Sequence, residues 1–159
     1  MQRPIPTDEE LLYDGGVMIT ETDLRGHITF ANRKFVEMSG YSNVELLGRP
    51  HNIVRHPDMP ACCFENMWDT IRRGDTWKGY VKNLRKDGAH YWVVVYVSPK
   101  CDATGRSIGY IAARKLPAPE TLETVKSRYS ELKMLEACNA ERERLYIANL
   151  MAQELPELP

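Results

Sequence analysis

The sequence of 159 residues predicts an α+β fold in which a five-stranded antiparallel sheet is covered on one face by short helices. Two strand-like runs near the N-terminus are joined by turn chemistry, which predicts a hairpin. Three further strand-like runs lie between residues 76 and 115 and are separated by two turn signals. Short helical patterns fill the segment between the two groups, so these helices have one sheet to cover.

The first 16 residues predict a cap that precedes the sheet. Thr7 followed by Glu10 has the form of a capping box, in which a hydroxyl and a carboxylate bond the free amides of a first helical turn. We therefore expect a short helix over residues 8–13, ended by Gly15 and Gly16.

The hairpin is predicted from residues 17–22 and 27–31, which are rich in β-branched and apolar side chains. Asp23-Leu24-Arg25-Gly26 between them is a turn sequence. The two runs therefore pair as antiparallel neighbours.

Two short helices are expected next. Residues 32–40 carry apolar side chains at helical spacing, and Asn32 is suited to cap the first turn. Ser42 stands three residues before Glu45, which predicts a second capped helix over residues 42–47.

The middle of the chain predicts a structured loop, a longer helix and three strands. Residues 51–60 hold two prolines and two histidines without periodicity, which is typical of a loop. Residues 61–73 place four large apolar side chains on one helical face: Phe64, Met67, Trp68 and Ile71. The strands are expected at 76–84, 89–98 and 107–115.

Residues 117–159 predict a C-terminal helix and tail, with the helix running to about Gln153. Leu122, Val125, Tyr129 and Leu132 follow the spacing of a coiled-coil seam, but the stripe then shifts its register. A short coiled coil and a helix packed back on its own sheet therefore remain equally open.

Charge and composition exclude several classes of protein. The 21 basic and 22 acidic residues nearly cancel, so no overall field favours nucleic acid or an anionic membrane. No apolar run is long enough for a membrane span, and the N-terminus lacks the apolar core of a signal peptide. We therefore expect a cytoplasmic protein.

The four cysteines lack the spacing of a structural metal site, so we expect reduced thiols and no bound metal. The adjacent pair Cys62 and Cys63 admits a strained disulfide or a soft-metal site. Cysteine at a helix start more often serves as a small apolar residue, and this is the interpretation we favour.

A long run of polar and aromatic residues makes the sequence recognisable. HisAsnIleValArgHisProAspMetPro at residues 51–60 resembles the PAS domain of bacterial aerotaxis receptors. The likeness covers roughly residues 17–115 and includes Met67-Trp68, Trp77-Lys78-Gly79, Arg85-Lys86-Asp87-Gly88 and Tyr91-Trp92-Val93. It implies the PAS fold, a sensor domain over residues 17–116, and FAD as the cofactor of the redox-sensing members.

A flavin requires an apolar slot for its ring and amide-like groups for the pyrimidine edge. Phe64 and Trp68 lie on the apolar helix face and are expected to wall the ring. Asn32 and Asn83 are expected to offer their amides, and Asn83 needs a polar partner if it is buried in a strand.

The phosphates and the adenosine require cationic and polar groups. Arg55, His56 and Asp58 match family positions that the resemblance assigns to the cofactor. Trp77 and Trp92 are expected as residues of the pocket or the sheet.

Each of these assignments has a plainer alternative. Phe64 and Trp68 suit an ordinary core, Asn32 suits a helix cap, and Arg55 with Asp58 suits an ion pair that fixes the loop. His56 suits a hydrogen-bonded loop residue.

Two other ligand classes fit the residues less well. Haem needs an axial histidine, and the helix at 61–73 contains none, although a neighbouring element remains able to supply one. Blue-light PAS domains carry a cysteine after a Gly-Arg-Asn motif, whereas Gly48-Arg49 here is followed by Pro50-His51-Asn52-Ile53. We therefore expect redox chemistry rather than a flavin adduct.

The resemblance implies a non-enzymatic sensor of redox state or oxygen that signals through its C-terminal helix to a chemotaxis-type output. The implied partner is a chemoreceptor signalling or HAMP-type domain, in the same chain or another. Such a partner would bring the protein to the inner face of the membrane. The sequence leaves a homodimer open. The alternatives are a cofactor-free interaction module, a haem-binding gas sensor and a small flavoenzyme.

Overall fold

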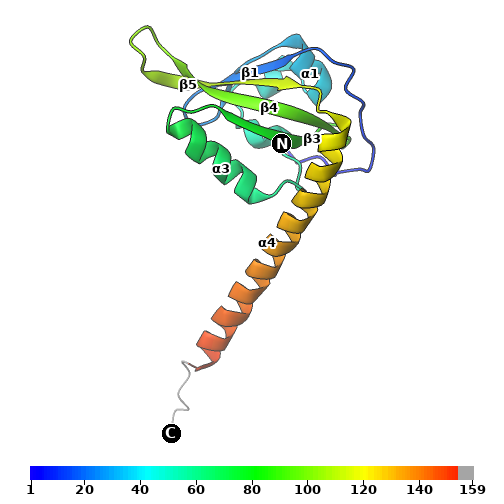
Figure 1. The fold of residues 1–159 in the computed structure, drawn as a ribbon, viewed down its shortest axis with the longest axis vertical. Helices are drawn as coiled ribbons and strands as arrows, with labels where there is room; N and C mark the ends of the chain where they lie inside the picture. Colours follow the sequence, from blue (N-terminus) through cyan, green and yellow to red (C-terminus); the bar gives the residue numbers. More distant parts are fainter. Residues whose placement is uncertain (154–159) are drawn as a thin grey trace.

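The computed structural model describes the backbone of residues 1–153 and the side chains of residues 1–145. The expected α+β architecture is confirmed: one five-stranded antiparallel sheet with short helices and a long C-terminal helix (Figure 1). The elements in chain order are β1 (Met18–Thr22), β2 (Ile28–Ala31), α1 (Arg33–Ser39), α2 (Asn43–Leu46), the 3-10 helix η1 (His51–Val54), α3 (Ala61–Arg72), β3 (Trp77–Leu84), β4 (His90–Cys101), β5 (Ser107–Lys115) and α4 (Pro119–Gln153).

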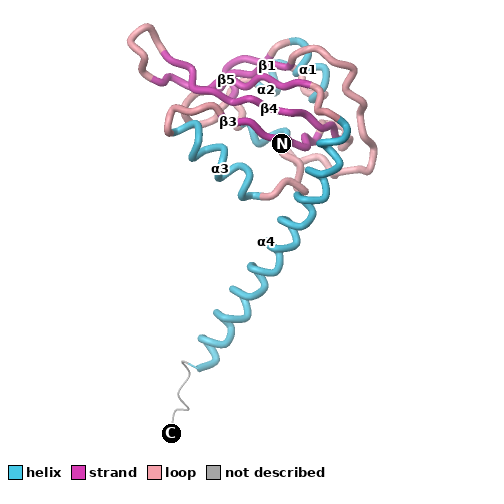
Figure 2. The backbone as a smooth tube through the Cα atoms, viewed as in Figure 1, coloured by secondary structure: helices cyan, strands magenta, loops and turns pink. Residues whose placement is uncertain are grey.

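The strands lie in the order β2-β1-β5-β4-β3, so the N-terminal hairpin pairs with the last strand rather than the third. The chain therefore leaves β2 at one edge, passes through α1, α2, η1 and α3, and enters β3 at the other edge (Figure 2). This crossing segment covers one face of the sheet and packs its apolar side chains against it.

Side-chain alternation assigns the two faces of the sheet. On β4, Val95 and Val97 line the cavity beneath α3, whereas Trp92 lies against α4 on the opposite face. The helix-covered face holds the core, which includes Phe35 of α1. We call it the inner face and the opposite one the outer face.

The predicted caps of α1 and α2 are confirmed. Asn32 accepts a hydrogen bond from the amide of Phe35, and Ser42 forms a reciprocal capping box with Glu45. These short helices have few hydrogen bonds of their own, so the caps and the apolar face together fix where they begin.

The expected helix over residues 8–13 is wrong. The segment is extended, and the amide of Leu11 donates to the carbonyl of His90 at 2.8 Å. The amide of His90 in turn donates to the carbonyl of Glu9 at 2.9 Å. This part of β4 lies before its pairing with β5 begins at Val94, so it has free backbone groups that the N-terminal segment satisfies.

Helix α4 begins on the outer face and then projects away from the domain (Figure 1). The hydroxyl of Tyr129 donates to the carbonyl of Tyr80 at 2.7 Å, and the Tyr129 ring lies 6.1 Å from that of Trp92. The first half of the helix therefore packs on its own sheet, while residues 137–145 are exposed. The predicted tail beyond residue 153 lies outside the described residues.

No helix within residues 1–153 combines the length and the apolar character needed to cross a membrane.

Candidate functional site

A cavity of about 280 Å³ lies between α3, η1 and the inner face of the sheet. Most of its wall is apolar, and a few polar groups interrupt it. The side chains that decide its chemistry are Thr20, His51, Arg55, Phe64, Trp68, Trp77, Asn83, Tyr110 and Arg114.

Helix α3 forms one wall of this cavity. Phe64, Met67 and Trp68 are only half-buried although they face the sheet, whereas Ile71 on the same helix face is 2% exposed. The three side chains stay partly open because the cavity, rather than the sheet, lies next to them. The predicted apolar face of α3 thus packs against the core at Ile71 and lines the cavity at Phe64, Met67 and Trp68.

The hairpin turn approaches this wall closely. A Cβ atom at Gly26, where φ is +83°, would lie 3.1 Å from the Trp68 ring, so the turn favours glycine for conformation and for space. The Trp68 ring also packs edge-on against Tyr110 at 5.7 Å. These contacts fix the orientation of the indole that faces the cavity.

Trp77 closes another part of the wall from β3. Its indole Nε1 donates to Asn66 Oδ1 at 2.9 Å, and its ring lies over Gly79, where any Cβ atom would collide with it. The missing side chain at Gly79 therefore makes room for the indole.

Arg114 is the most deeply buried of the three arginines in the cavity wall. It is 4% exposed, and its guanidinium donates to Thr20 Oγ1 at 3.0 Å and approaches His51 Nε2 at 2.8 Å. The Phe35 ring lies 4.9 Å below it. Within residues 1–145 no carboxylate forms an ion pair with this buried cation. Burial lowers the pKa of Arg114 to about 10, so the side chain stays cationic at neutral pH.

His51 is held neutral by this environment. Desolvation and the neighbouring Arg114 lower its pKa to about 3. Its Nε2 therefore acts as an acceptor for the guanidinium, which leaves the proton on Nδ1. Because Nε2 is occupied by Arg114 and Thr20, this cavity histidine is poorly placed to serve as an axial haem ligand.

Asn83 presents an unpaired donor inside the domain. The residue is 3% exposed and lines the cavity from β3, and its Nδ2 has no hydrogen-bond partner within residues 1–145. The cross-strand neighbour Tyr91 is fully buried, and its hydroxyl also lacks a partner. Buried polar groups of this kind are costly unless a ligand or a water completes them.

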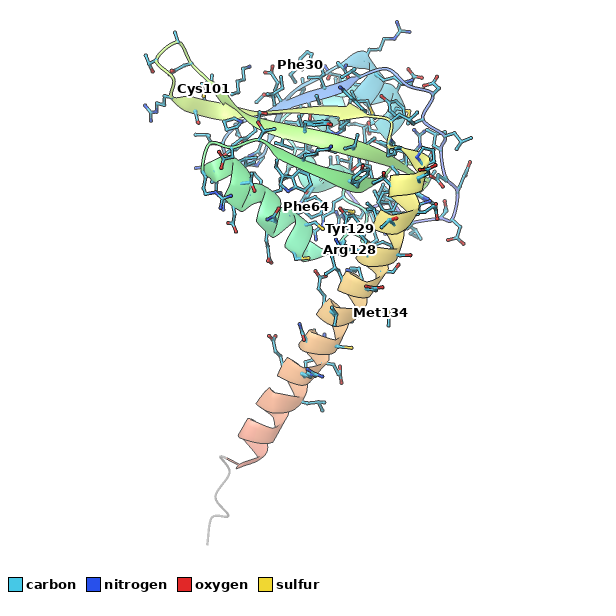
Figure 3. All side chains as sticks on the ribbon, in the orientation of Figure 1. Phe30, Phe64, Cys101, Arg128, Tyr129 and Met134 are labelled. Atoms are coloured by element: carbon cyan, nitrogen blue, oxygen red, sulfur yellow. The ribbon has the colours of Figure 1, made fainter. Side chains whose placement is uncertain are left out.

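Arg55 and Phe64 lie together in the wall near its exposed rim. The guanidinium of Arg55 lies 4.4 Å from the centre of the Phe64 ring, and both side chains are half-buried. Arg25 and Asn52 also line the cavity and are exposed. Two arginines thus stand where an anionic part of a ligand would leave the cavity. Figure 3 labels Phe64 on α3.

Four of the nine residues expected at a ligand do not line the cavity. Asn32 does not face it, because its amide donates to Val17 and accepts from Ile19 and Phe35. Trp92 lies on the outer face beneath α4.

His56 and Asp58 lie behind the cavity wall. His56 is 3% exposed, accepts from the amide of Asp58 at 3.1 Å, and packs edge-on against His90. Burial, reinforced by Lys82, lowers the pKa of His56 to about 4. Asp58 pairs with Lys82 at 2.8 Å, so the alternative of an Arg55–Asp58 ion pair is wrong.

Four polar and aromatic residues of the cavity are not among those predicted from the sequence: Thr20, His51, Tyr110 and Arg114. Strand alternation carried the signal for two of them. Tyr110 and Arg114 share the inner face of β5 with Ala112. Inward-facing strand positions are usually apolar, so an arginine there is a signal of function.

Within the described part of the chain, no group of three or more His, Cys, Asp or Glu side chains is placed to hold a metal ion.

Comparison with known proteins agrees with this architecture. The sequence profile of the PAS fold matches residues 28–114. The aerotaxis receptor of Escherichia coli (strain K12) is 39% identical over 148 residues, which is 93% of this chain and 29% of the receptor. The nitrogen fixation regulatory protein of Klebsiella pneumoniae is 30% identical over 114 residues, 71% of this chain and 23% of that protein.

Solved structures share the fold. The structure of a light-oxygen-voltage domain studied with a flavin analogue superposes with a TM-score of 0.61 at 22% identity, covering 74% of this chain and 89% of that one. The chain spans less than a third of the length of the two curated relatives. The family profile covers more than half of the chain, and the protein belongs to the PAS family.

Proposed function

We propose that this PAS domain is a redox sensor that holds FAD in the cavity beneath α3. The observation that carries the proposal is the buried Arg114, which pairs with no carboxylate among residues 1–145, in the wall of a mostly apolar cavity. Within the same residues, the cavity-lining Asn83 has a side-chain donor without a partner. A ring ligand with several acceptor atoms, which gains negative charge on reduction, matches both groups.

Each chemical part of the ligand has a candidate partner. Phe64 and Trp68 would wall the ring, and Asn83 would donate to its polar edge. Arg55 at the rim, together with Arg25, would face the phosphates. The cavity volume of about 280 Å³ lies near the lower end of ligand pockets, so the ring would fill it and the remaining parts would extend outward.

Four of the predicted residues would not contact the ligand and would instead support the elements around it: Asn32, His56, Asp58 and Trp92. His56 and Asp58 shape the loop that carries Arg55, and Asn32 anchors α1 to β1. Trp92 connects the sheet to α4.

The bound flavin would supply reversible electron transfer. Arg114 would hold the added negative charge, and Asn83 would adjust its hydrogen bond to the changed acceptor. Strand β5 carries Arg114 one residue before its end and leads within four residues into α4, so a displacement of this strand bears directly on the helix.

The short link from β5 to α4 provides a route by which the signal would leave the domain. We propose a sensor rather than an enzyme, with residues 1–16 as a cap, 17–116 as the sensor and 117–159 as the output segment. The 39% identity with the aerotaxis receptor supports a chemoreceptor signalling or HAMP-type domain as the partner, in the same chain or another. We place the domain in the cytoplasm, where such a partner would bring it to the inner face of the membrane.

One observation favours a second candidate, a cofactor-free interaction module. Phe30 is 46% exposed and pairs with Glu21 on the outer face of the sheet, away from α4 (Figure 3). Tyr96 and Ile111 lie on the same face and are half-covered. A second copy of this chain that packs on this face would bury these side chains.

The proposal is tested by identifying the chromophore that the purified protein carries. The protein is purified in the dark, its visible spectrum is recorded, and any released compound is identified by mass spectrometry. Flavin bands with released FAD support the proposal, whereas a haem Soret band contradicts it. A colourless protein that fails to take up FAD and shows a concentration-dependent mass favours the interaction module.

A further inference from the structure

The N-terminus of α3 depends on α4 for a carboxylate. Its N-cap is Pro60, which forms no side-chain cap, and its first turn holds no acidic residue. Glu136 of α4 instead accepts a hydrogen bond from the amide of Cys62 at 3.2 Å. A carboxylate at this position satisfies a free amide and complements the helix dipole.

The same turn carries two adjacent thiols. Cys62 is exposed, and Cys63 is half-buried and packs against the core, where Tyr129 of α4 also packs. Burial raises the pKa of the Cys63 thiol, and burial together with this thiol raises the pKa of Tyr129. Glu136 of α4 thus contacts the turn that contains the cysteines directly. Tyr129 donates its hydrogen bond to Tyr80 on β3, and its hydroxyl lies close enough to the Cys63 thiol for each group to affect the pKa of the other.

We propose that Cys62 and Cys63 form a thiol–disulfide switch that releases α4 from the domain. The oxidant is a small disulfide of the glutathione type. The exposed Cys62 attacks it as a thiolate and expels one thiolate, leaving a mixed disulfide. Cys63, after losing its proton, attacks the Cys62 sulfur of that bond and expels the second thiolate. The protein loses two electrons and two protons, and the oxidant becomes two thiols.

The helix cannot keep its first turn when this bond forms. Neighbouring Cα atoms lie about 3.8 Å apart, whereas relaxed disulfides span about 4.4 to 6.8 Å. The resulting small ring is incompatible with α-helical torsions at Cys62 and Cys63, so the turn must unwind. Unwinding moves the amide of Cys62 away from Glu136 and the side chain of Cys63 away from Tyr129.

The strain also sets the direction of the switch. A strained disulfide is reduced more readily than a structural one, so the bond forms under oxidising conditions and opens when they pass. The device acts on α4 from the α3 side, whereas the proposed flavin acts through β5. It does not require a bound flavin, and its test is independent of the chromophore.

The experiment uses the full chain with Cys101→Ser and Cys138→Ser, two exposed positions far from this turn in sequence. The protein is equilibrated in glutathione buffers of graded potential, quenched in acid and alkylated. Peptide mass spectrometry reports the state of Cys62 and Cys63, and hydrogen exchange reports the amides of residues 62–66 and 126–136.

The expected product lacks two hydrogen atoms in the peptide with both cysteines, and both segments then exchange at least about tenfold faster. In the same background, Cys62→Ser and Cys63→Ser each form no such bond and keep the slow exchange. A mixed disulfide that stays on Cys62 at every potential overturns the proposal. An internal disulfide that leaves exchange in residues 126–136 unchanged overturns it as well.

Discussion

The guanidinium of Arg114 lies 2.8 Å from His51 Nε2 and 3.0 Å from Thr20 Oγ1, with no carboxylate paired to it among residues 1–145. Its hydrogen bonds are satisfied by neutral groups, so its charge remains unbalanced in the cavity wall. At an effective dielectric constant of about 20, such a charge stabilises an anion about 6 Å away by roughly 3 kcal/mol before screening. The cavity therefore favours a ligand in its more negative state.

Arg114→Gln is expected to lower the midpoint potential of bound flavin, because the reduced ring loses a stabilising positive charge. A tenfold change in the one-electron equilibrium equals about 59 mV, and we expect a fall of at least this size. Spectroelectrochemical titration of the purified protein measures it.

Thr20→Val is the matched control. It removes one hydrogen bond to Arg114 and keeps the charge, so its potential should stay close to that of the parent. Equal falls in both variants would mean that packing, rather than the charge of Arg114, sets the potential.

Local signals in the sequence predicted most of the fold. Asn32 and Ser42 cap the helices that their neighbours in the chain predicted, and the face of α3 follows from the spacing of Phe64 and Trp68. Each of these features is decided within one or two turns of chain, where propensity and periodicity operate.

The features that the sequence did not predict depend on residues far away in the chain. The extended segment around Glu9 is set by hydrogen bonds to His90, which lies about eighty residues away and outweighs a local capping box. Of the two places open to Trp92, the pocket and the sheet, strand alternation selects the outer face of the sheet and removes it from the ligand. Arg114 was missed because only the sheet order shows that it meets His51.

Asn83→Leu is expected to weaken flavin binding about tenfold while the ligand-free protein stays at least as stable as the parent. The buried Nδ2 has no hydrogen-bond partner among the described side chains, so its removal costs no internal hydrogen bond there. Binding is measured by fluorescence titration, and the free energy of unfolding by urea denaturation.

In flavin-loaded protein, the same substitution should also abolish redox-dependent hydrogen exchange in α4. Asn139→Leu, on the exposed part of α4, is the control and should leave flavin affinity unchanged. An intact exchange response in Asn83→Leu would contradict the role of this amide in signalling.

Stability should fall on mild acidification because buried histidines are neutral in the folded protein. The pKa of His56 is lowered to about 4, whereas the unfolded chain titrates near 6.5. The unfolded state thus binds more protons between these values, and stability present above pH 6.5 is lost as the pH falls toward 4. His56→Asn keeps an acceptor for the amide of Asp58 and removes the titration.

Urea denaturation at pH 7.5 and 5.5 measures this effect. The parent should lose about 1 kcal/mol more than His56→Asn between the two values. His27→Asn, whose side chain is 38% exposed, serves as the control and should follow the parent. A parent and a His56→Asn protein with equal losses would show that other groups dominate the acid response.

Tyr129→Phe is expected to loosen α4 while the sensor domain keeps its stability. The substitution removes the bond from the Tyr129 hydroxyl to the Tyr80 carbonyl but keeps the ring that packs near Trp92. A hydrogen bond of this kind contributes about 1 kcal/mol, so hydrogen exchange in residues 122–136 should rise about fivefold. Arg128→Ala, an exposed neighbour on the same helix (Figure 3), should leave the exchange unchanged. Equal exchange in Tyr129→Phe and the parent would mean that apolar packing alone holds the helix on the sheet.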